Sequence, residues 1–270
     1  MKKRTLFILT AFLCCIALIS CKKDETKTNN NNGNTENPGG GNGNQGNPST
    51  AVIIHNAVTD YDGNSYDAVQ LGDQIWMAEN LHTTHFANGV AIPEGSSEYS
   101  PSRYTPNGDA NTCGYLYNWP AVVHGSNGSA ANPSGVQGVC PTGWHVPSDA
   151  EWTQMTDYVG SRSEFVCSGS SENIAKALAS NQGWQMYSGD SCAVCNDQST
   201  NNATGFSAYP VGRYFSGGSD GSGTVAYFWT ATRSYGNNVY YRFISAQNVS
   251  VESFDGFMYG YSYSVRCVKD

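Results

Sequence analysis

The chain has 270 residues, with 14 lysines and arginines against 22 aspartates and glutamates. This acidic balance argues against a partner that is nucleic acid or an anionic lipid surface. Charged residues are few, whereas glycine and tyrosine are abundant, a composition that favours a loop-rich, β-containing extracellular fold over a helical one.

The N-terminus has the pattern of an export signal. Basic residues at 2–4 precede an apolar run, 6–19, which is too short to span a bilayer as a stable helix. The run ends in Leu18-Ile19-Ser20-Cys21, which resembles the lipobox of bacterial lipoproteins. The resemblance implies that residues 1–20 are a signal peptide and that Cys21 carries lipid. The alternative is an ordinary secretory signal with a chance cysteine.

A second signal and a tether follow the cysteine. Lys22-Lys23-Asp24-Glu25 resembles the export signal of surface lipoproteins in the Bacteroidetes, which implies an outer-membrane protein facing the cell exterior. A solvated charge cluster is the alternative. Residues 26–50 lack apolar side chains that could offset the entropy cost of ordering, so 21–50 is predicted to be a disordered tether reaching about 30 Å.

The remainder, 51–270, contains no second linker and is predicted to be one domain. Turn residues at 62–64 and 71–73 predict a hairpin of two strands, 65–70 and 74–78. Residues 82–112 look irregular, and the apolar, aromatic stretch 115–123 is predicted to be a strand or a buried extended segment.

Two helices are predicted in the middle of the domain. Ser148 and Glu151 form a capping box, which predicts a helix ending at Gly160. A second helix is predicted over 172–179, capped by Ser171. From Gly205 onward apolar residues alternate as in strands, so the order of elements predicts an α+β domain.

The cysteines point to disulfides. Two of the nine leave with the signal peptide and one takes lipid, so an even set of six remains in an exported chain: Cys113, Cys140, Cys167, Cys192, Cys195 and Cys267. Fifteen connectivities are possible for six cysteines. Cys192-Ala-Val-Cys195 has the spacing of a redox or zinc motif, but it lacks a second C-x-x-C, and structural bonding is favoured.

Seven ordered motifs then carry a family resemblance over residues 58–270. Among them are Gln74-Ile-Trp-Met-Ala-Glu-Asn-Leu81, Gly114-Tyr-Leu-Tyr-Asn-Trp119, Cys140-Pro-Thr-Gly-Trp-His-Val-Pro147 and Ser264-Val-Arg-Cys-Val-Lys-Asp270. Together they closely resemble the Fibrobacter succinogenes major paralogous domain. That family resembles a branch of the C-type-lectin-like superfamily, which also holds formylglycine-generating enzymes and phage-type variable receptor-binding domains.

The resemblance implies a fold in which two helices flank a twisted antiparallel sheet and the chain ends meet. It also implies a disulfide between Cys140 and Cys267. For Cys167, a bond to either Cys192 or Cys195 is expected. The Glu-Pro-Asn or Gln-Pro-Asp and Trp-Asn-Asp triplets of calcium-dependent lectins are absent from the sequence, so calcium-dependent sugar binding of that type is not expected.

The sequence contains patterns that resemble metal sites, but none of them has the spacing or the partners that catalysis or metal binding requires. Asp60-Tyr-Asp62-Gly-Asn64 lacks the spacing of an EF-hand and is interpreted as a turn. His82 and His85 have a ligand-like spacing but no helix signal or third ligand, and His145 is interpreted as a packed core histidine. No catalytic residue, metal or cofactor is therefore predicted.

Aromatic density marks the candidate ligand site. Fifteen aromatic residues lie between 209 and 263, and aromatic faces stack on the apolar faces of sugar rings. Most are expected to pack within sheets. The ligand-facing candidates are those with glycine, serine, asparagine or aspartate neighbours: Tyr214, Phe215, Tyr235, Phe254 and Phe257.

These observations favour a surface-anchored, non-catalytic binding module for glycan or protein ligands, held by outer-membrane lipid through Cys21. The alternatives are an extracellular enzyme with an unpatterned active site and a structural envelope protein.

The first test concerns the anchor. Cys21→Ala is expected to leave the precursor uncleaved or to release unacylated protein, because acyl chains supply the membrane attachment. Membrane fractionation, intact mass and acyl labelling measure the outcome. A variant with all three unchanged would show that Cys21 is not lipidated.

Overall fold

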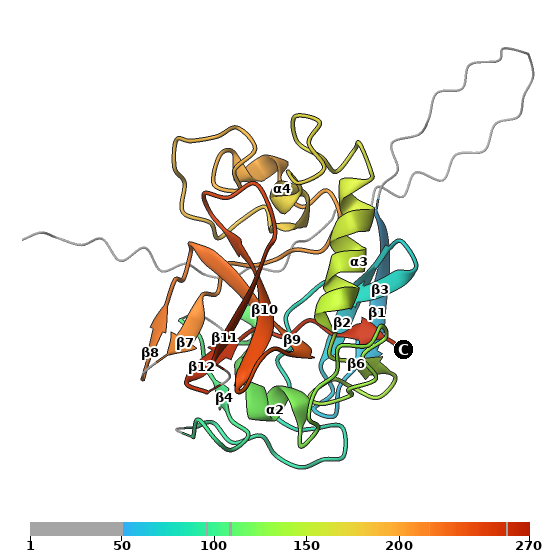
Figure 1. Ribbon diagram of the computed structural model, residues 1–270, viewed down its shortest axis with the longest axis vertical. Helices are drawn as coiled ribbons and strands as arrows, with labels where there is room; N and C mark the ends of the chain where they lie inside the picture. Colours follow the sequence, from blue (N-terminus) through green and yellow to red (C-terminus); the bar gives the residue numbers. More distant parts are fainter. Residues whose placement is uncertain (1–50, 96, 108–109, 216, 258) are drawn as a thin grey trace, which may run out of the picture.

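The domain is built from three antiparallel sheets and one long helix (Figure 1). The computed structural model describes residues 51–95, 97–107, 110–215, 217–257 and 259–270; the predicted signal peptide and tether lie outside this range. The sheet-rich α+β architecture confirms that part of the predicted fold class. No helix in the described ranges is long and apolar enough to cross a membrane.

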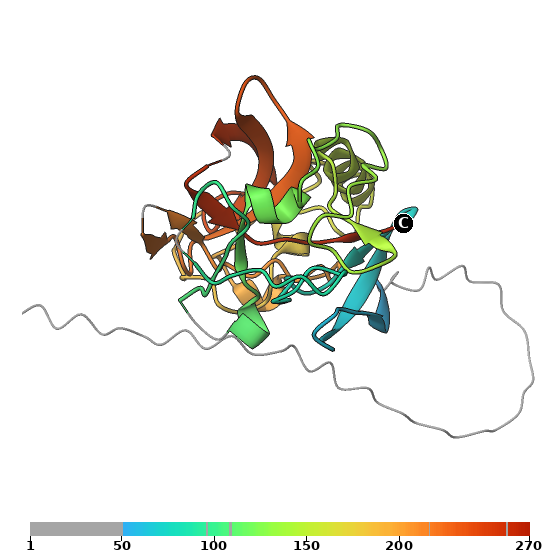
Figure 2. The same cartoon turned by 90° about the horizontal axis from the view of Figure 1, so that it is seen from below.

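The first sheet brings the two ends of the described chain together. Its order is β1 (Val52–Thr59), β2 (Ser65–Leu71), β3 (Gln74–Met77), β13 (Val268–Lys269) and β6 (Trp144–His145). Figures 1 and 2 show the red C-terminal end beside the blue N-terminal strands. The predicted hairpin is confirmed as β2 and β3. Sequence reasoning missed β1, an edge strand whose Val52 and Ile53 stay exposed.

The C-terminal half supplies most of the other two sheets, as its alternating pattern predicts. One sheet has the order β11 (Glu252–Phe257), β10 (Asn238–Ser245) and β9 (Val225–Arg233). The other has the order β4 (Arg103–Tyr104), β5 (Leu116–Asn118), β12 (Tyr261–Tyr263), β7 (Arg213–Phe215) and β8 (Gly218–Asp220). Segments far apart in the sequence thus meet in this last sheet.

The first predicted helix is confirmed as α3 (Asp149–Gly160). Ser148 Oγ accepts a hydrogen bond from Glu151 N at 3.2 Å, and the Glu151 carboxylate accepts one from Ser148 N at 2.9 Å, which completes the capping box. Trp152 then packs into a cluster of rings whose centroids lie 4.8 to 6.0 Å apart. The members of this ring cluster are Trp76, Trp152, Phe206 and Phe228.

The second predicted helix is wrong in length. Only α4 (Ala175–Leu178) is helical, and no side chain caps it. Asn173 N donates to Ser170 O and Ala175 N to Val249 O, so the segment before α4 is held in turns and tied to a distant loop. Two further short helices are α1 (Ala110–Cys113) and the 3-10 turn η1 (Gln198–Thr200).

The stretch predicted as extended is half strand and half helix. After β5, the chain enters α2 (Trp119–Val123), because the Asn118 side chain caps the N–H of Ala121 at 3.1 Å. Pro120 suits the first turn of a helix, where its missing N–H costs nothing. The aromatic composition concealed this capping signal.

A buried arginine joins the first sheet to the rest of the core. The Arg266 guanidinium donates to Asn80 Oδ1 at 2.7 Å, to the carbonyl oxygens of Met77 at 3.1 Å and Ser207 at 2.8 Å, and to that of Phe206. Burial lowers the pKa of Arg266 to about 9.

His145 is held by a carboxylate on each ring nitrogen. Nε2 lies 2.7 Å from Glu151 Oε1, and Nδ1 lies 2.8 Å from Asp270 Oδ1. Burial disfavours the imidazolium, but hydrogen bonds and charge from the two carboxylates outweigh it and raise the pKa of His145. Burial likewise opposes ionisation of Glu151, yet bonds from His145 and from the Ser148 and Ser134 amides lower the pKa of Glu151.

The disulfides separate the two cysteines of the C-x-x-C motif. Cys140 is bonded to Cys267, the pair that the family resemblance implies, and Cys167 is bonded to Cys192. Cys195 is a buried free thiol, so the motif closes no ring of its own. The first bridge closes a loop with a sequence separation of 127, and closure of such a loop stabilises the fold by at most about 5 kcal/mol in the chain-entropy model.

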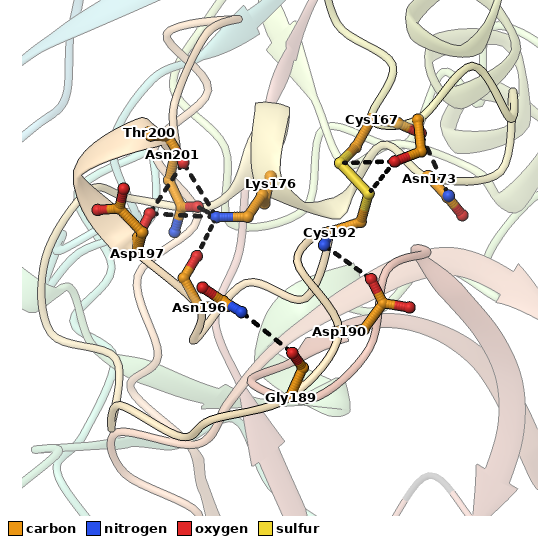
Figure 3. The surroundings of a disulfide bond; sticks show 11 residues. Cys167, Asn173, Lys176, Gly189, Asp190, Cys192, Asn196, Asp197, Thr200 and Asn201 are labelled. Carbon is orange, nitrogen blue, oxygen red and sulfur yellow. Dashed lines mark hydrogen bonds between the residues drawn. A yellow bond between two sulfur atoms is a disulfide. The ribbon is translucent and has the colours of Figure 1, made fainter.

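A lysine orders the segment beside the second bridge (Figure 3). Lys176 Nζ donates to the carbonyl oxygens of Asn196 and Asp197, to Thr200 Oγ1 at 3.0 Å and to Asn201 Oδ1 at 3.3 Å. Burial of this ammonium lowers its pKa. Hydrogen bonds to the Lys176 ammonium, rather than pairing within a sheet, thus hold the loop after α4 in place.

The His145 ion pairs predict a pH window for stability. Because the pKa of folded His145 is raised, its contribution is full below the ordinary value of 6.5 and is lost as pH rises through the folded value. Because the pKa of folded Glu151 is lowered, its contribution is full above 4.5 and is lost as pH falls through the folded value. His145→Gln is therefore expected to lower the free energy of unfolding most between pH 4.5 and 6.5, by about 3 kcal/mol.

Urea unfolding across this pH range measures the effect. His55→Gln is the control, because His55 is mostly exposed and its contact with Asp67 stabilises little. A His145→Gln deficit that did not shrink towards alkaline pH would contradict the charged state of His145.

Peptide mapping without reduction tests the bridges. Peptides joining Cys140 to Cys267 and Cys167 to Cys192 are expected, and Cys195 should react with a maleimide only after unfolding, because its side chain is buried. Recovery of Cys167 bonded to Cys195 would overturn the assignment.

Candidate functional site

A cavity opens on one face of the sheet that contains β12. Its volume is about 190 Å³, and the residues that line it are Glu98, Tyr104, Asn118, Tyr214, Gly217, Gly260, Tyr261 and Ser262. Asn118 and Ser262 are buried, whereas Glu98 and Gly217 are exposed, so the cavity runs from a polar floor to an open rim.

Strand pairing places the floor and wall of the cavity. Ser262 on β12 lies opposite Asn118 on β5 and opposite Tyr214 on β7, so the three side chains share one face of the sheet. The ring of Tyr104 stacks on that of Tyr214 with centroids 4.1 Å apart. Burial raises the pKa of Tyr104, and Tyr214 and Glu98 add to the effect, so the phenol stays protonated.

Asn118 positions the segment that carries Glu98. Its Nδ2 donates to Ser97 O at 2.9 Å and to Ser100 O at 2.8 Å, while its Oδ1 accepts from Ser102 N at 2.9 Å. The Tyr104 hydroxyl donates to Ser97 O at 3.1 Å. These bonds hold the loop against β5, so Glu98 is presented at the rim by a fixed backbone.

Three polar groups of the cavity remain available to a ligand. Within the described ranges, neither the Glu98 carboxylate nor the hydroxyls of Ser262 and Tyr214 make a hydrogen bond. Ser262 lines the cavity, and within the described ranges Trp152 Nε1 is the one fully buried side-chain polar atom without a hydrogen bond, so the Ser262 hydroxyl is open to the cavity. A ligand in the cavity can therefore bond this hydroxyl in place of solvent.

The opposite face of the same sheet carries a second aromatic surface. The Arg213 guanidinium lies over the rings of Phe215, Tyr227 and Tyr261 at 5.4 to 5.7 Å and pairs with Asp220 at 2.9 Å. We call Arg213 and the four residues that it contacts the Arg213 surface; these four are Phe215, Tyr227, Tyr261 and Asp220.

The predicted ligand residues therefore divide between several places. Tyr214 lines the cavity, whereas its neighbour Phe215 points to the other face and stacks on Tyr261 at 4.4 Å, because side chains alternate along a strand. Phe254 contacts Tyr241 on the sheet next to the Arg213 surface.

The remaining two candidates lie apart from the cavity. Phe257 packs edge-on against Tyr259, which in turn contacts Tyr99 beside Glu98. Tyr235 lies in the turn between β9 and β10, is 92% exposed and contacts no ring within the described ranges. A role for these two in binding stays a prediction.

Among the residues that line the cavity, the sequence analysis named only Tyr214 as a candidate. Glu98 and Tyr104 come from the segment that looks irregular, and Asn118 was hidden in an apolar stretch. Ser262 had a usable signal, because it alternates with Tyr261 and Tyr263 in a strand and must face the other side of the sheet.

The candidate metal-binding patterns are engaged in structural contacts. Asp62 accepts bonds from Thr84 N and His85 Nδ1, both at 2.5 Å. Burial opposes its ionisation, but these bonds hold the pKa of Asp62 at about 2. His82 instead packs on Tyr66, with the ring centroids 4.7 Å apart. Among the described residues, no three histidine, cysteine, aspartate or glutamate side chains are grouped to hold a metal ion.

Comparison with known proteins gives a family and nothing narrower. No curated protein matches the chain, and no solved structure does. The profile of the Fibrobacter succinogenes major domain matches residues 69–269, which include the whole cavity and the bonds from Cys140 to Cys267 and from Cys167 to Cys192. The chain belongs to the Fibrobacter succinogenes major domain family.

Proposed function

We propose that this protein is a non-catalytic binding module for carbohydrate, displayed on the cell surface by a lipid anchor at Cys21. The cavity is the single observation that carries the proposal. Its stacked Tyr104 and Tyr214 provide an aromatic wall, and two free hydroxyls and a carboxylate provide hydrogen-bonding groups. This combination of a ring face and a few fixed polar groups suits a sugar, which is apolar on its faces and polar at its edges.

The size of the cavity agrees with this ligand class. One water needs about 10–15 Å³ of such volume, so 190 Å³ accommodates on the order of a dozen heavy atoms. A single hexose ring has this size. A longer glycan would extend past the rim, where the exposed Tyr99 lies beside Glu98.

We also propose a C-type-lectin-like arrangement for the domain. The first and last strands share one sheet, and the disulfide from Cys140 to Cys267 links the segment before α3 to the last strand region. Both features support the arrangement, although the second helix is reduced to one turn. The calcium triplets of sugar-binding lectins are absent from the sequence, so we propose that binding needs no calcium.

A lack of catalysis is part of the proposal. His145 would be the obvious general base, but both of its nitrogens are bonded to carboxylates and it is only 3% exposed. The cavity itself presents a single carboxylate, whereas glycoside hydrolysis usually requires two.

A glycan array with the full-length chain tests the proposal. At least one glycan is expected to bind, with or without a chelator. Tyr214→Ala is expected to weaken that binding by roughly tenfold, because it removes one wall of the cavity. Tyr187→Ala is the control, since Tyr187 is an exposed tyrosine beyond α4 that lies outside the cavity lining.

Melting curves of both variants separate lost binding from lost folding. An array without any bound glycan, or binding that chelator abolishes, would contradict the proposal.

A further inference from the structure

Glu98 gives the cavity an uncompensated negative charge. Its carboxylate lies beside Gly260, where an added β-carbon would be 3.6 Å from Oε1. Within the described ranges Glu98 makes no ion pair, and no lysine or arginine lines the cavity.

The nearest basic side chains are already engaged. Arg213 precedes Tyr214 in β7 and points to the opposite face of the sheet, where it pairs with Asp220. Arg103 bonds the carbonyl of Ile92 at 3.1 Å and lies over the ring of Tyr115 at 4.5 Å. Neither arginine is placed to neutralise the rim.

The aromatic wall also favours a positively charged ligand. The face of a tyrosine ring attracts a cation, and an aromatic wall combined with a carboxylate is a recurrent way to hold an ammonium group. Tyr104 and Tyr214 supply the wall, and Glu98 supplies the counter-charge. An anionic sugar would instead meet a carboxylate with no cation to offset it.

The hydroxyl groups on the cavity floor narrow the class of ligand further. A plain alkyl ammonium, such as a lysine side chain, has no group besides its ammonium that would bond the hydroxyl of Ser262 on the cavity floor. A sugar ring does. Building on the proposed carbohydrate function, we infer that the cavity selects an amino sugar with a free ammonium group, held by Glu98 and bonded by Ser262.

Isothermal titration of the full-length chain tests the inference with matched probes. The β-1,4-linked trisaccharide of glucosamine is expected to bind, and the same trisaccharide of N-acetylglucosamine is expected to bind at least tenfold more weakly. Salt should weaken the first interaction more than the second, because only the first contains an ion pair.

Glu98→Gln keeps the shape of the side chain and removes its charge. This variant is expected to bind the glucosamine trisaccharide about tenfold more weakly and to leave the affinity for the acetylated form unchanged. Glu172→Gln is the control, because Glu172 is an exposed glutamate outside the cavity lining and lies three residues before α4, an element well separated from β12 in Figure 1.

The outcomes separate this inference from the proposed function. Equal affinity for the two trisaccharides, or a Glu98→Gln variant with wild-type selectivity, would overturn the inference and leave carbohydrate binding intact. A trilysine peptide that bound as tightly as the glucosamine trisaccharide would overturn it in favour of a protein ligand. An array with no bound glycan would overturn both.

Discussion

A charged side chain at the centre of the molecule, Arg266, sets the arrangement of much of the domain. A buried guanidinium is costly unless every donor finds an acceptor. Here the acceptors come from the end of β3, from Asn80 and from the loop at 206–207. Since three of them are backbone carbonyls, the cost constrains the path of the chain as well as the side chains.

The neighbours of Arg266 extend this constraint. Its guanidinium lies 4.7 Å from the ring centre of Phe206 and 5.6 Å from that of Phe228, so the ring cluster packs directly on the charge. The next residue, Cys267, is bonded to Cys140, just ahead of β6 and α3. The adjacent residues Arg266 and Cys267 thus supply hydrogen bonds, ring contacts and a disulfide. Together these interactions fix the position of the first sheet relative to α3.

The sequence predicted those elements that have local signals. The capping box of α3 and the turn glycine of the β2–β3 hairpin are short-range features, and both were found. The extent of α4 was not, because the segment before it is held by a turn at Asn173 and by a bond from Ala175 to the distant Val249, rather than by a side-chain cap. The cavity combines residues from 98 to 262, so local patterns could identify Tyr214 as a candidate but not its partners.

The position of β1 at the edge of the first sheet has a mechanical consequence. A pull on the chain before residue 51 enters the domain through β1, which among the described strands pairs with β2 alone. The disulfides that join two described cysteines begin at Cys140, so neither of these two bonds spans β1. The β1–β2 pairing is therefore expected to separate under load before the rings of Phe206 and Phe228, which pack on Arg266 inside the loop closed by the bond from Cys140 to Cys267.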